Sequence, residues 1–312
     1  MVTGNLGAPR FAIDRITRQD GANVRVAAPI LGGQPKIRGR RTKTRSRHPK
    51  PGGCLGIIDA LERFGRFVQF AREATLAIPR AAIRRPGEVL VQFERVAWGT
   101  LPIAALAGAS VGLVTWLQTR RILVTYGIEA TLPSILAAAV VIETGPMLAG
   151  LLVAGRLGAG LAAELASMGL TEELDAREVL GAPVVPALVA PRALACALAL
   201  PLLTIVLDAA ALAGALGADL ASGASTPALF GSRALAFIRL TDAVPATVKT
   251  AAFGWLIGLI GCWTGLGADR STEDVGRAAT RGVVRATLAI FAANVALVPL
   301  LQLAANALGW TI

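Results

Sequence analysis

Two ionisable side chains, Glu143 and Asp208, lie inside long apolar stretches of this chain, and a third, Lys249, begins another such stretch. An ionised side chain at the centre of a bilayer costs at least about 2.5 to 3.5 kcal/mol on insertion scales, so such residues pair or face a polar cavity. Two interpretations follow: structural neutralisation, including a pair between Glu143 and Lys249, or a cavity that admits a headgroup or a proton. Pro146 frees backbone carbonyls beside Glu143 and kinks the helix, which favours the cavity.

A second group of charged residues occupies residues 169–183, between two apolar stretches. The segment predicts a helix of about nine residues, with Thr171 as N-cap, acidic residues in the first turn, and Gly181 and Pro183 as the stop. It is either an ordinary connecting helix or a docking helix that transmits force from a cytoplasmic motor. The docking residues would be Thr171, Glu172, Glu173, Asp175, Arg177 and Glu178.

Other chemistry finds little support in the sequence. His48 is the single histidine, and three cysteines, Cys54, Cys196 and Cys262, are widely spaced. These residues build neither a histidine-based triad nor a zinc site nor a disulfide framework. No phosphate-binding G-x-x-x-x-G-K-[ST] loop occurs. We therefore predict no catalytic residue, no metal site and no cofactor in this chain, which disfavours a membrane-intrinsic enzyme.

The elements that must position these residues are membrane helices. The chain of 312 residues is 54% hydrophobic and 16% charged, whereas soluble domains are about 25% charged. Charge-free runs cover residues 96–119, 250–268 and 286–312, and about 20 helical residues cross a bilayer. We predict an all-α polytopic membrane protein with about five transmembrane helices, at residues 98–118, 131–155, 186–216, 249–268 and 282–308. Small-xxx-small glycine pairs, such as Gly108/Gly112, predict close helix contacts.

The positive charge lies almost entirely before the first predicted span. Residues 1–95 carry 19 of the 31 Lys and Arg and a balance of +12, against −1 for residues 96–312. Residues 1–55 predict a basic, disordered tail, which places the N-terminus in the cytoplasm. The tail could be a solubilising or orienting segment, bind anionic headgroups, or be an organelle transit peptide. With one aromatic, Phe11, it gives no basis for nucleic-acid binding.

Residues 56–95 form an amphipathic region that precedes the first span. Apolar residues recur at helical spacing from Ile57 to Ala71, with Arg63, Arg66 and Arg72 between them. This pattern is typical of a helix that lies in a membrane interface. We predict the interfacial helix over residues 57–78, followed by interruptions of the helical path at Pro79 and Pro86.

The motifs together resemble the MlaE/YrbE family, the permeases of ABC transporters that work with MCE-domain proteins. The resemblance rests on ETGPMLAGLLVAGRLG at 143–158, AELASM at 163–168, TEELDA at 171–176 and LVAPR at 188–192. It continues through PLLT at 201–204 with Asp208, Lys249 and VGRAAT at 275–280, and it covers residues 96–312 as a permease domain. The chain departs from the family at Ala166 and Ala182, and at residues 269–274, where glycines are common.

The resemblance implies a transporter subunit rather than an enzyme. Two copies would form a homodimer, bind a separate cytoplasmic ABC ATPase that holds ATP and Mg, and meet an MCE-domain substrate-binding protein outside. The cargo would be phospholipid or a related lipid. Glu143, Lys249, Asp208 and Pro146 would be lipid-cavity residues, and residues 171–181 the coupling helix. The setting would be a bacterial inner membrane or the chloroplast inner envelope.

The competing class is an ion-coupled secondary transporter in which Glu143 and Asp208 take up protons. It predicts transport without an ATPase and usually an internal sequence repeat. No such repeat occurs in this sequence.

Overall fold

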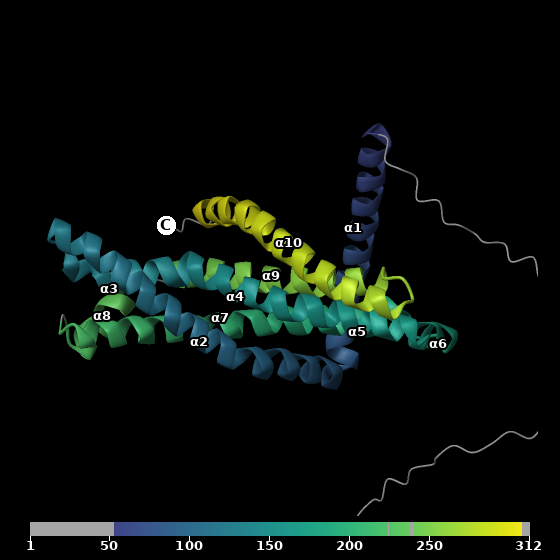
Figure 1. The fold of residues 1–312 in the computed structure, drawn as a ribbon, viewed down its shortest axis with the longest axis horizontal. Helices are drawn as coiled ribbons and strands as arrows, with labels where there is room; N and C mark the ends of the chain where they lie inside the picture. The colour runs from purple at the N-terminus through teal and green to yellow at the C-terminus, as the bar shows by residue number, and fades with distance from the viewer. Residues whose placement is uncertain (1–52, 224, 238–239, 308–312) are drawn as a thin grey trace, which may run out of the picture. The chain divides into compact units, whose positions relative to one another are not determined.

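A computed structural model describes residues 53–223, 225–237 and 240–307, and this part of the chain is all-helical (Figure 1). Five helical stretches are long and apolar enough to cross a membrane, which confirms the predicted all-α polytopic fold. Residues 1–52, most of the predicted tail, lie outside the described residues. The five stretches are Pro86–Tyr126, Glu129–Leu170, Val185–Ala221, Val244–Leu266 and Thr272–Leu303.

The described chain forms long helical rods, and two short helices, α6 (Glu173–Val179) and α8 (Pro227–Phe237), lie between successive rods. The second rod alone joins six helical pieces end to end, two of them π-helical turns. In order, the elements are α1 (Gly53–Arg84), α2 (Pro86–Tyr126), η1 (Glu129–Thr131), α3 (Leu132–Ala139), η2 (Val140–Thr144), α4 (Gly145–Val153), η3 (Ala154–Gly158), α5 (Ala159–Leu170), α6 (Glu173–Val179), η4 (Val185–Val189), α7 (Ala190–Ala221), α8 (Pro227–Phe237), α9 (Leu240–Leu266) and α10 (Thr272–Ala307).

The rods extend well beyond the predicted apolar spans. Arg156 follows directly after the predicted span at residues 131–155, but it lies inside the second rod on η3, so the predicted end of that helix is wrong. Its guanidinium lies where a Cβ on Gly99 would be, and its Nη1 donates to Thr100 Oγ1 at 3.0 Å. Gly99 of α2 leaves space for the Arg156 side chain, and Thr100 of α2 accepts its hydrogen bond. The helix can therefore continue past Arg156. Apolar length predicts the membrane-crossing part of a helix and does not predict its ends.

α1 is a single helix that runs through Pro79, so the predicted interruption there is wrong. Pro79 removes the helical donor for the carbonyl of Thr75, but both residues are exposed, so that carbonyl is free to bond water. The break comes at Arg85, and Pro86 begins α2. One face of α1, including Phe70 and Ala74, packs against the bundle. The helix runs across the long rods rather than along them (Figure 1).

Glycines bring the rods into backbone contact, as their spacing predicts. A Cβ on Gly112 of α2 would lie 1.8 Å from the carbonyl oxygen of Ala211 on α7, and one on Gly108 would lie 2.3 Å from that of Leu207. Gly254 makes a similar approach to α7. Close packing of small residues stabilises helix association in lipid. α7 is therefore enclosed by α2 on one side and α9 on another.

Candidate functional site

A polar cluster joins three rods in the middle of the bundle. Lys249 Nζ, from α9, donates to Glu143 Oε2, from η2, at 2.7 Å. Asn294 Nδ2, from α10, donates to Glu143 Oε1 at 2.6 Å. Both oxygens of the carboxylate are therefore engaged by residues more than 100 positions away in sequence. We call Glu143, Lys249 and Asn294 the midspan cluster; its ion pair is the pair considered in the sequence analysis.

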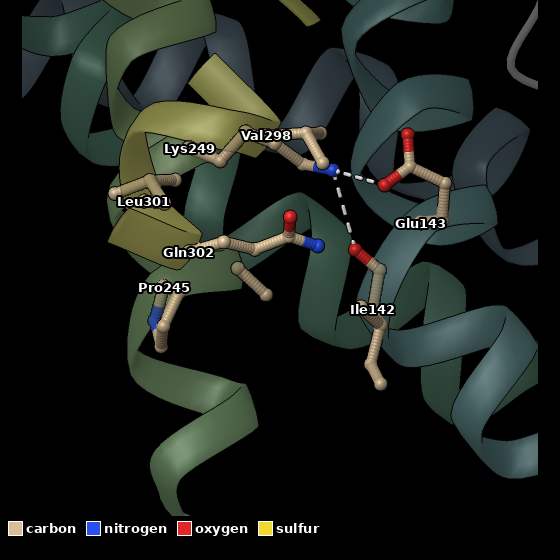
Figure 2. Close-up of a pocket in the computed structure, with 8 residues that line it drawn as sticks. Ile142, Glu143, Pro245, Lys249, Val298, Leu301 and Gln302 are labelled. Carbon is tan, nitrogen blue, oxygen red and sulfur yellow. Dashed lines mark hydrogen bonds and ion pairs between the residues drawn. The ribbon is translucent and has the colours of Figure 1, made fainter. Parts of the chain in front are cut away.

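The backbone next to Glu143 takes part in the same cluster. Pro146 has no N–H to offer the carbonyl of Ile142 four residues earlier, and Lys249 Nζ donates to that carbonyl at 3.3 Å (Figure 2). The helix around Glu143 is a π-turn, in which the Gly145 N–H bonds the Val140 carbonyl. π-turns within α-helices are frequent at functional sites. The predicted effect of Pro146, a freed carbonyl, is therefore present and is used by Lys249.

The two charged partners differ in burial, and a pocket opens beside them. The Lys249 side chain is 4% exposed and that of Glu143 is 44% exposed. Val298, Leu301 and Gln302 of α10 and Pro245 of α9 line this pocket on the side of Lys249, and Ile142 and Glu143 line the opposite side (Figure 2). Its volume is about 80 Å³, below the roughly 300 Å³ of ordinary ligand pockets. One copy of the chain thus presents a charged recess with an apolar rim rather than a closed binding site.

Asp208 does not join the midspan cluster. It lies on α7, and a Cβ on Gly145 would lie 1.8 Å from its Oδ1. Its Oδ1 is buried and has no hydrogen-bond donor among the described residues. The structure therefore places Asp208 against Gly145, the residue that precedes Pro146, with no bond to Glu143 or Lys249 in the described part of the chain. Its predicted role in a cavity stays a prediction.

Asn294 is the cluster member that was not predicted from the sequence. It lies in the charge-free run 286–312, and a search for charges passes over an amide. The usable signal was an amide side chain within an apolar segment, because amides in membrane helices bond across helices.

The predicted docking segment forms α6, a helix of seven residues. The prediction that Thr171 is its N-cap is wrong: Thr171 ends α5, and its Oγ1 donates back to the Ser167 carbonyl at 3.2 Å. The reason is that α5 continues to Leu170, so the hydroxyl serves the free carbonyls of that helix. Glu172 takes the N-cap position in a left-handed conformation, with φ of 60°.

The end of α6 follows the prediction. Gly181 has φ of 75°, and its N–H bonds the Glu178 carbonyl at 2.9 Å while that of Ala182 bonds the Arg177 carbonyl at 3.0 Å. This pair of bonds is a Schellman motif, which ends a helix at glycine. Val179 and Leu180 next to it are 88% and 83% exposed.

One acidic residue of α6 is already paired within the chain. Arg270, from the loop between α9 and α10, donates to both oxygens of Asp175, at 2.6 and 2.7 Å. These hydrogen bonds hold the pKa of the Asp175 carboxyl below its ordinary value. Glu172, Glu173 and Glu178 are exposed, and Arg177 is half-buried. The acidic surface of α6 is therefore formed by Glu172, Glu173 and Glu178, because Asp175 is engaged in the ion pair with Arg270.

The fold and these two features define a multi-pass membrane protein with a polar recess in its bundle and an acidic helix at one end. The model of the family "Permease MlaE" matches residues 89–300. The chain therefore belongs to the MlaE permease family, and the resemblance seen in its motifs is confirmed.

Curated relatives agree with this assignment. A probable ABC transporter permease protein of Synechocystis sp. is 34% identical over 66% of this chain and 78% of its own length. One from Rickettsia typhi is 29% identical over 68% of this chain and 82% of its own length. The Arabidopsis thaliana protein trigalactosyldiacylglycerol 1, chloroplastic, is 34% identical over 66% of this chain and 59% of its own length.

Proposed function

We propose that two copies of this chain form the membrane pathway of an ABC transporter that moves phospholipid or a related lipid between membranes. Membership in a family whose relatives are named ABC transporter permeases supports an ATP-driven transporter. A separate ATPase would bind ATP and Mg and hydrolyse the ATP, and an MCE-domain protein would exchange lipid on the opposite side. The N-terminus would be cytoplasmic, in a bacterial inner membrane or the chloroplast inner envelope.

The midspan cluster is the observation that carries this proposal. A charged group beside an apolar rim suits an amphiphile, whose polar head and apolar chains need both. Only 11% of the most apolar window of α10 is buried within one copy, and α10 supplies Val298, Leu301 and Gln302 to the pocket. A second copy packed near α10 would enclose the recess and enlarge it to the size of a lipid.

The α6 end supplies the link to the ATPase. Glu172, Glu173 and Glu178 offer acidic contacts, and Val179 with Leu180 offers an apolar contact next to them. ATP binding to two ATPase copies would draw the two α6 helices together and narrow the space between the permease copies. Lipid leaves only if the narrow state binds it less tightly than the open state.

A photo-crosslinking amino acid at position 301 tests the lipid pathway. Leu301 lines the pocket, and Leu303 on the same helix is 66% exposed and does not line it. In membranes that contain the partners, we expect a probe at 301 to label phospholipid and to lose that labelling when ATP is added. A probe at 303 should label lipid regardless of ATP. Labelling at 301 that ATP does not alter would contradict the proposed pathway.

Charge reversal on α6 tests the coupling role. We expect Glu172→Lys with Glu173→Lys to abolish ATPase copurification in mild detergent, because the partner would meet two like charges. Glu129→Lys makes the same type of change at an exposed site on the opposite end of the bundle and should leave copurification intact. Equal ATPase recovery from both variants would remove α6 from the docking surface.

The ion-coupled carrier has one observation in its favour, the buried Asp208 Oδ1 with no donor in the described chain. A carboxylate oxygen so placed favours uptake of a proton. This candidate predicts transport that persists without any ATPase and stops in Asp208→Asn. Transport that needs the ATPase and survives Asp208→Asn would exclude it.

A further inference from the structure

The end of the bundle remote from α6 contains a polar pocket that the proposed transport pathway does not use. It has a volume of about 350 Å³ and lies among the ends of α2 and α7, the start of the second rod, and α8. α3 and α8 lie side by side at this end (Figure 1). The polar residues that line it are Arg120, Glu129, Asp219, Ser222, Ser225 and Arg233. We call it the distal pocket.

A buried carboxylate organises one wall of the distal pocket. Asp219 is 4% exposed. It accepts a hydrogen bond from Trp116 Nε1 at 3.0 Å on Oδ1 and one from Ser225 Oγ on Oδ2. Both of its oxygens are thus bonded by neutral donors. The Arg120 guanidinium lies over the Trp116 ring, with its Cζ 5.0 Å from the ring centre, which fixes the cation by a cation–π contact.

Within the described residues, neither cation of the distal pocket forms an ion pair. Arg233 Nη1 donates to the Ala130 carbonyl at 3.2 Å, and neither Arg120 nor Arg233 has a carboxylate oxygen within 4.0 Å in the described chain. Glu129 is exposed at the rim. Two guanidinium groups held by an aromatic ring and a carbonyl therefore face the pocket, and guanidinium forks match phosphate geometry.

An apolar groove adjoins the distal pocket through Arg120. Its volume is about 500 Å³, and it is lined by Trp116, Leu117, Arg121 and Val124 in addition to Arg120. Leu117 and Val124 are each 51% exposed. A free phosphate would need the cations alone, whereas an amphiphile would use the cations and the groove together. This juxtaposition favours a lipid as the occupant.

We propose that the distal pocket and groove bind a lipid with a phosphate headgroup. The phosphate lies between Arg120 and Arg233, and one acyl chain lies along Leu117 and Val124. The site is separate from the midspan cluster, and its occupation requires neither ATP nor a partner protein.

Binding of short-chain lipids to the purified full-length chain in uncharged detergent tests this site. The probes are dihexanoyl phosphatidate, dihexanoylglycerol without the phosphate, and inorganic phosphate without the chains, each titrated by calorimetry. We expect Arg120→Gln and Arg233→Gln each to raise the Kd for phosphatidate about tenfold or more, because each removes charge-assisted hydrogen bonds to phosphate. Arg80→Gln makes the same charge change at an exposed site on α1, outside the linings of the pocket and the groove, and should leave that Kd unchanged.

The three probes also identify the source of the phosphate. Tight binding of phosphatidate, weaker binding of inorganic phosphate at the same arginines and weaker binding of dihexanoylglycerol support the lipid site. An equal Kd for phosphatidate in the native, Arg120→Gln and Arg233→Gln chains overturns it, as does binding of inorganic phosphate as tight as that of phosphatidate. Thermal unfolding of each variant verifies that it is folded. Because the assay contains no ATPase, its result is independent of the crosslinking result at Leu301.

Discussion

Two ion pairs of similar geometry lie at different depths in this molecule. Lys249 and Glu143 meet at 2.7 Å in the middle of the bundle, and Arg270 and Asp175 meet at 2.6 Å at the α6 end. The Lys249 side chain is 4% exposed, whereas those of Arg270 and Asp175 are 56% and 48% exposed. Distance does not separate the two pairs, but burial does.

The difference lies in what remains when one partner is removed. A buried charge that loses its partner keeps the full cost of its desolvation, whereas an exposed charge is solvated by water and screened by salt. The midspan cluster is therefore a fixed point of the bundle. The pair at the α6 end can exchange its bonds for others, which suits a surface where a partner protein binds.

Glu143→Leu is expected to have the largest effect on stability. It leaves the buried Lys249 ammonium with the Ile142 carbonyl as its remaining acceptor in the described chain. Breaking one side of a buried pair costs about 3–5 kcal/mol. Thermal unfolding in detergent should show this loss, and Glu143→Gln, which keeps an acceptor oxygen, should lose less. Equal unfolding temperatures for the two variants would mean that the Lys249 charge is not desolvated.

Lys249→Met is expected to cost less than Glu143→Leu. The group left behind is the Glu143 carboxylate, which is 44% exposed and keeps its bond from Asn294, so the loss should be about 1–3 kcal/mol. The double variant Glu143→Leu with Lys249→Met removes both charges. It should be more stable than Glu143→Leu alone, because apolar replacement of a whole buried pair is often close to neutral. A double variant as unstable as the sum of the two single variants would show that the side chains do not interact.

Asn294→Leu should have a smaller effect, of about 1 kcal/mol on unfolding, because it removes one hydrogen bond to a carboxylate that keeps Lys249. Gln302→Leu is the matched control, since Gln302 is an exposed amide on the same helix, and it should leave the unfolding temperature unchanged. If both amides have the same effect, the loss reflects the helix rather than the bond to Glu143.

The fold was more predictable from the sequence than the site was. The length of an apolar segment can be compared directly with the thickness of a bilayer, so the sequence was sufficient to predict five membrane-spanning helices. Helix ends depend on neighbours: Arg156 continues its helix because Gly99 and Thr100 of α2 accommodate its side chain. Glu143 and Lys249 were found because unpaired charges in apolar segments are costly.

Other site residues required the tertiary structure. Asn294 carries no charge, so its role became visible only where α10 meets η2. Asp175 and Arg270 are 95 residues apart. The local sequence does not indicate that Asp175 pairs with Arg270 rather than with another arginine at the α6 end. Thr171 is a favourable N-cap residue by type, but the length of α5 decides which helix it serves.

Loss of the Arg270–Asp175 pair at the α6 end is expected to have the smallest effect on stability. Its contribution is also expected to depend on pH in a simple way. Because Arg270 lowers the pKa of Asp175 below its ordinary value of 3.8, the folded state binds that proton less readily than the unfolded state. The contribution of the pair is therefore complete above pH 3.8 and is lost as the pH falls through the lower folded pKa.

A spin label at the exposed position 179 on α6 reports this pair without unfolding the bundle. Its mobility should be constant from neutral pH to about pH 4 and should rise below that. Arg270→Gln should raise the mobility of the label already at neutral pH, because it removes the partner of Asp175. Added salt should raise the mobility in the native chain, because exposed charges are screened. Arg281→Gln, which removes a cation near Asp274 rather than Asp175, is the control. If Arg270→Gln and salt leave the mobility of the label unchanged, α6 is held by its apolar contacts. The α6 end and the midspan cluster would then differ in side-chain packing rather than in the burial of their ion pairs.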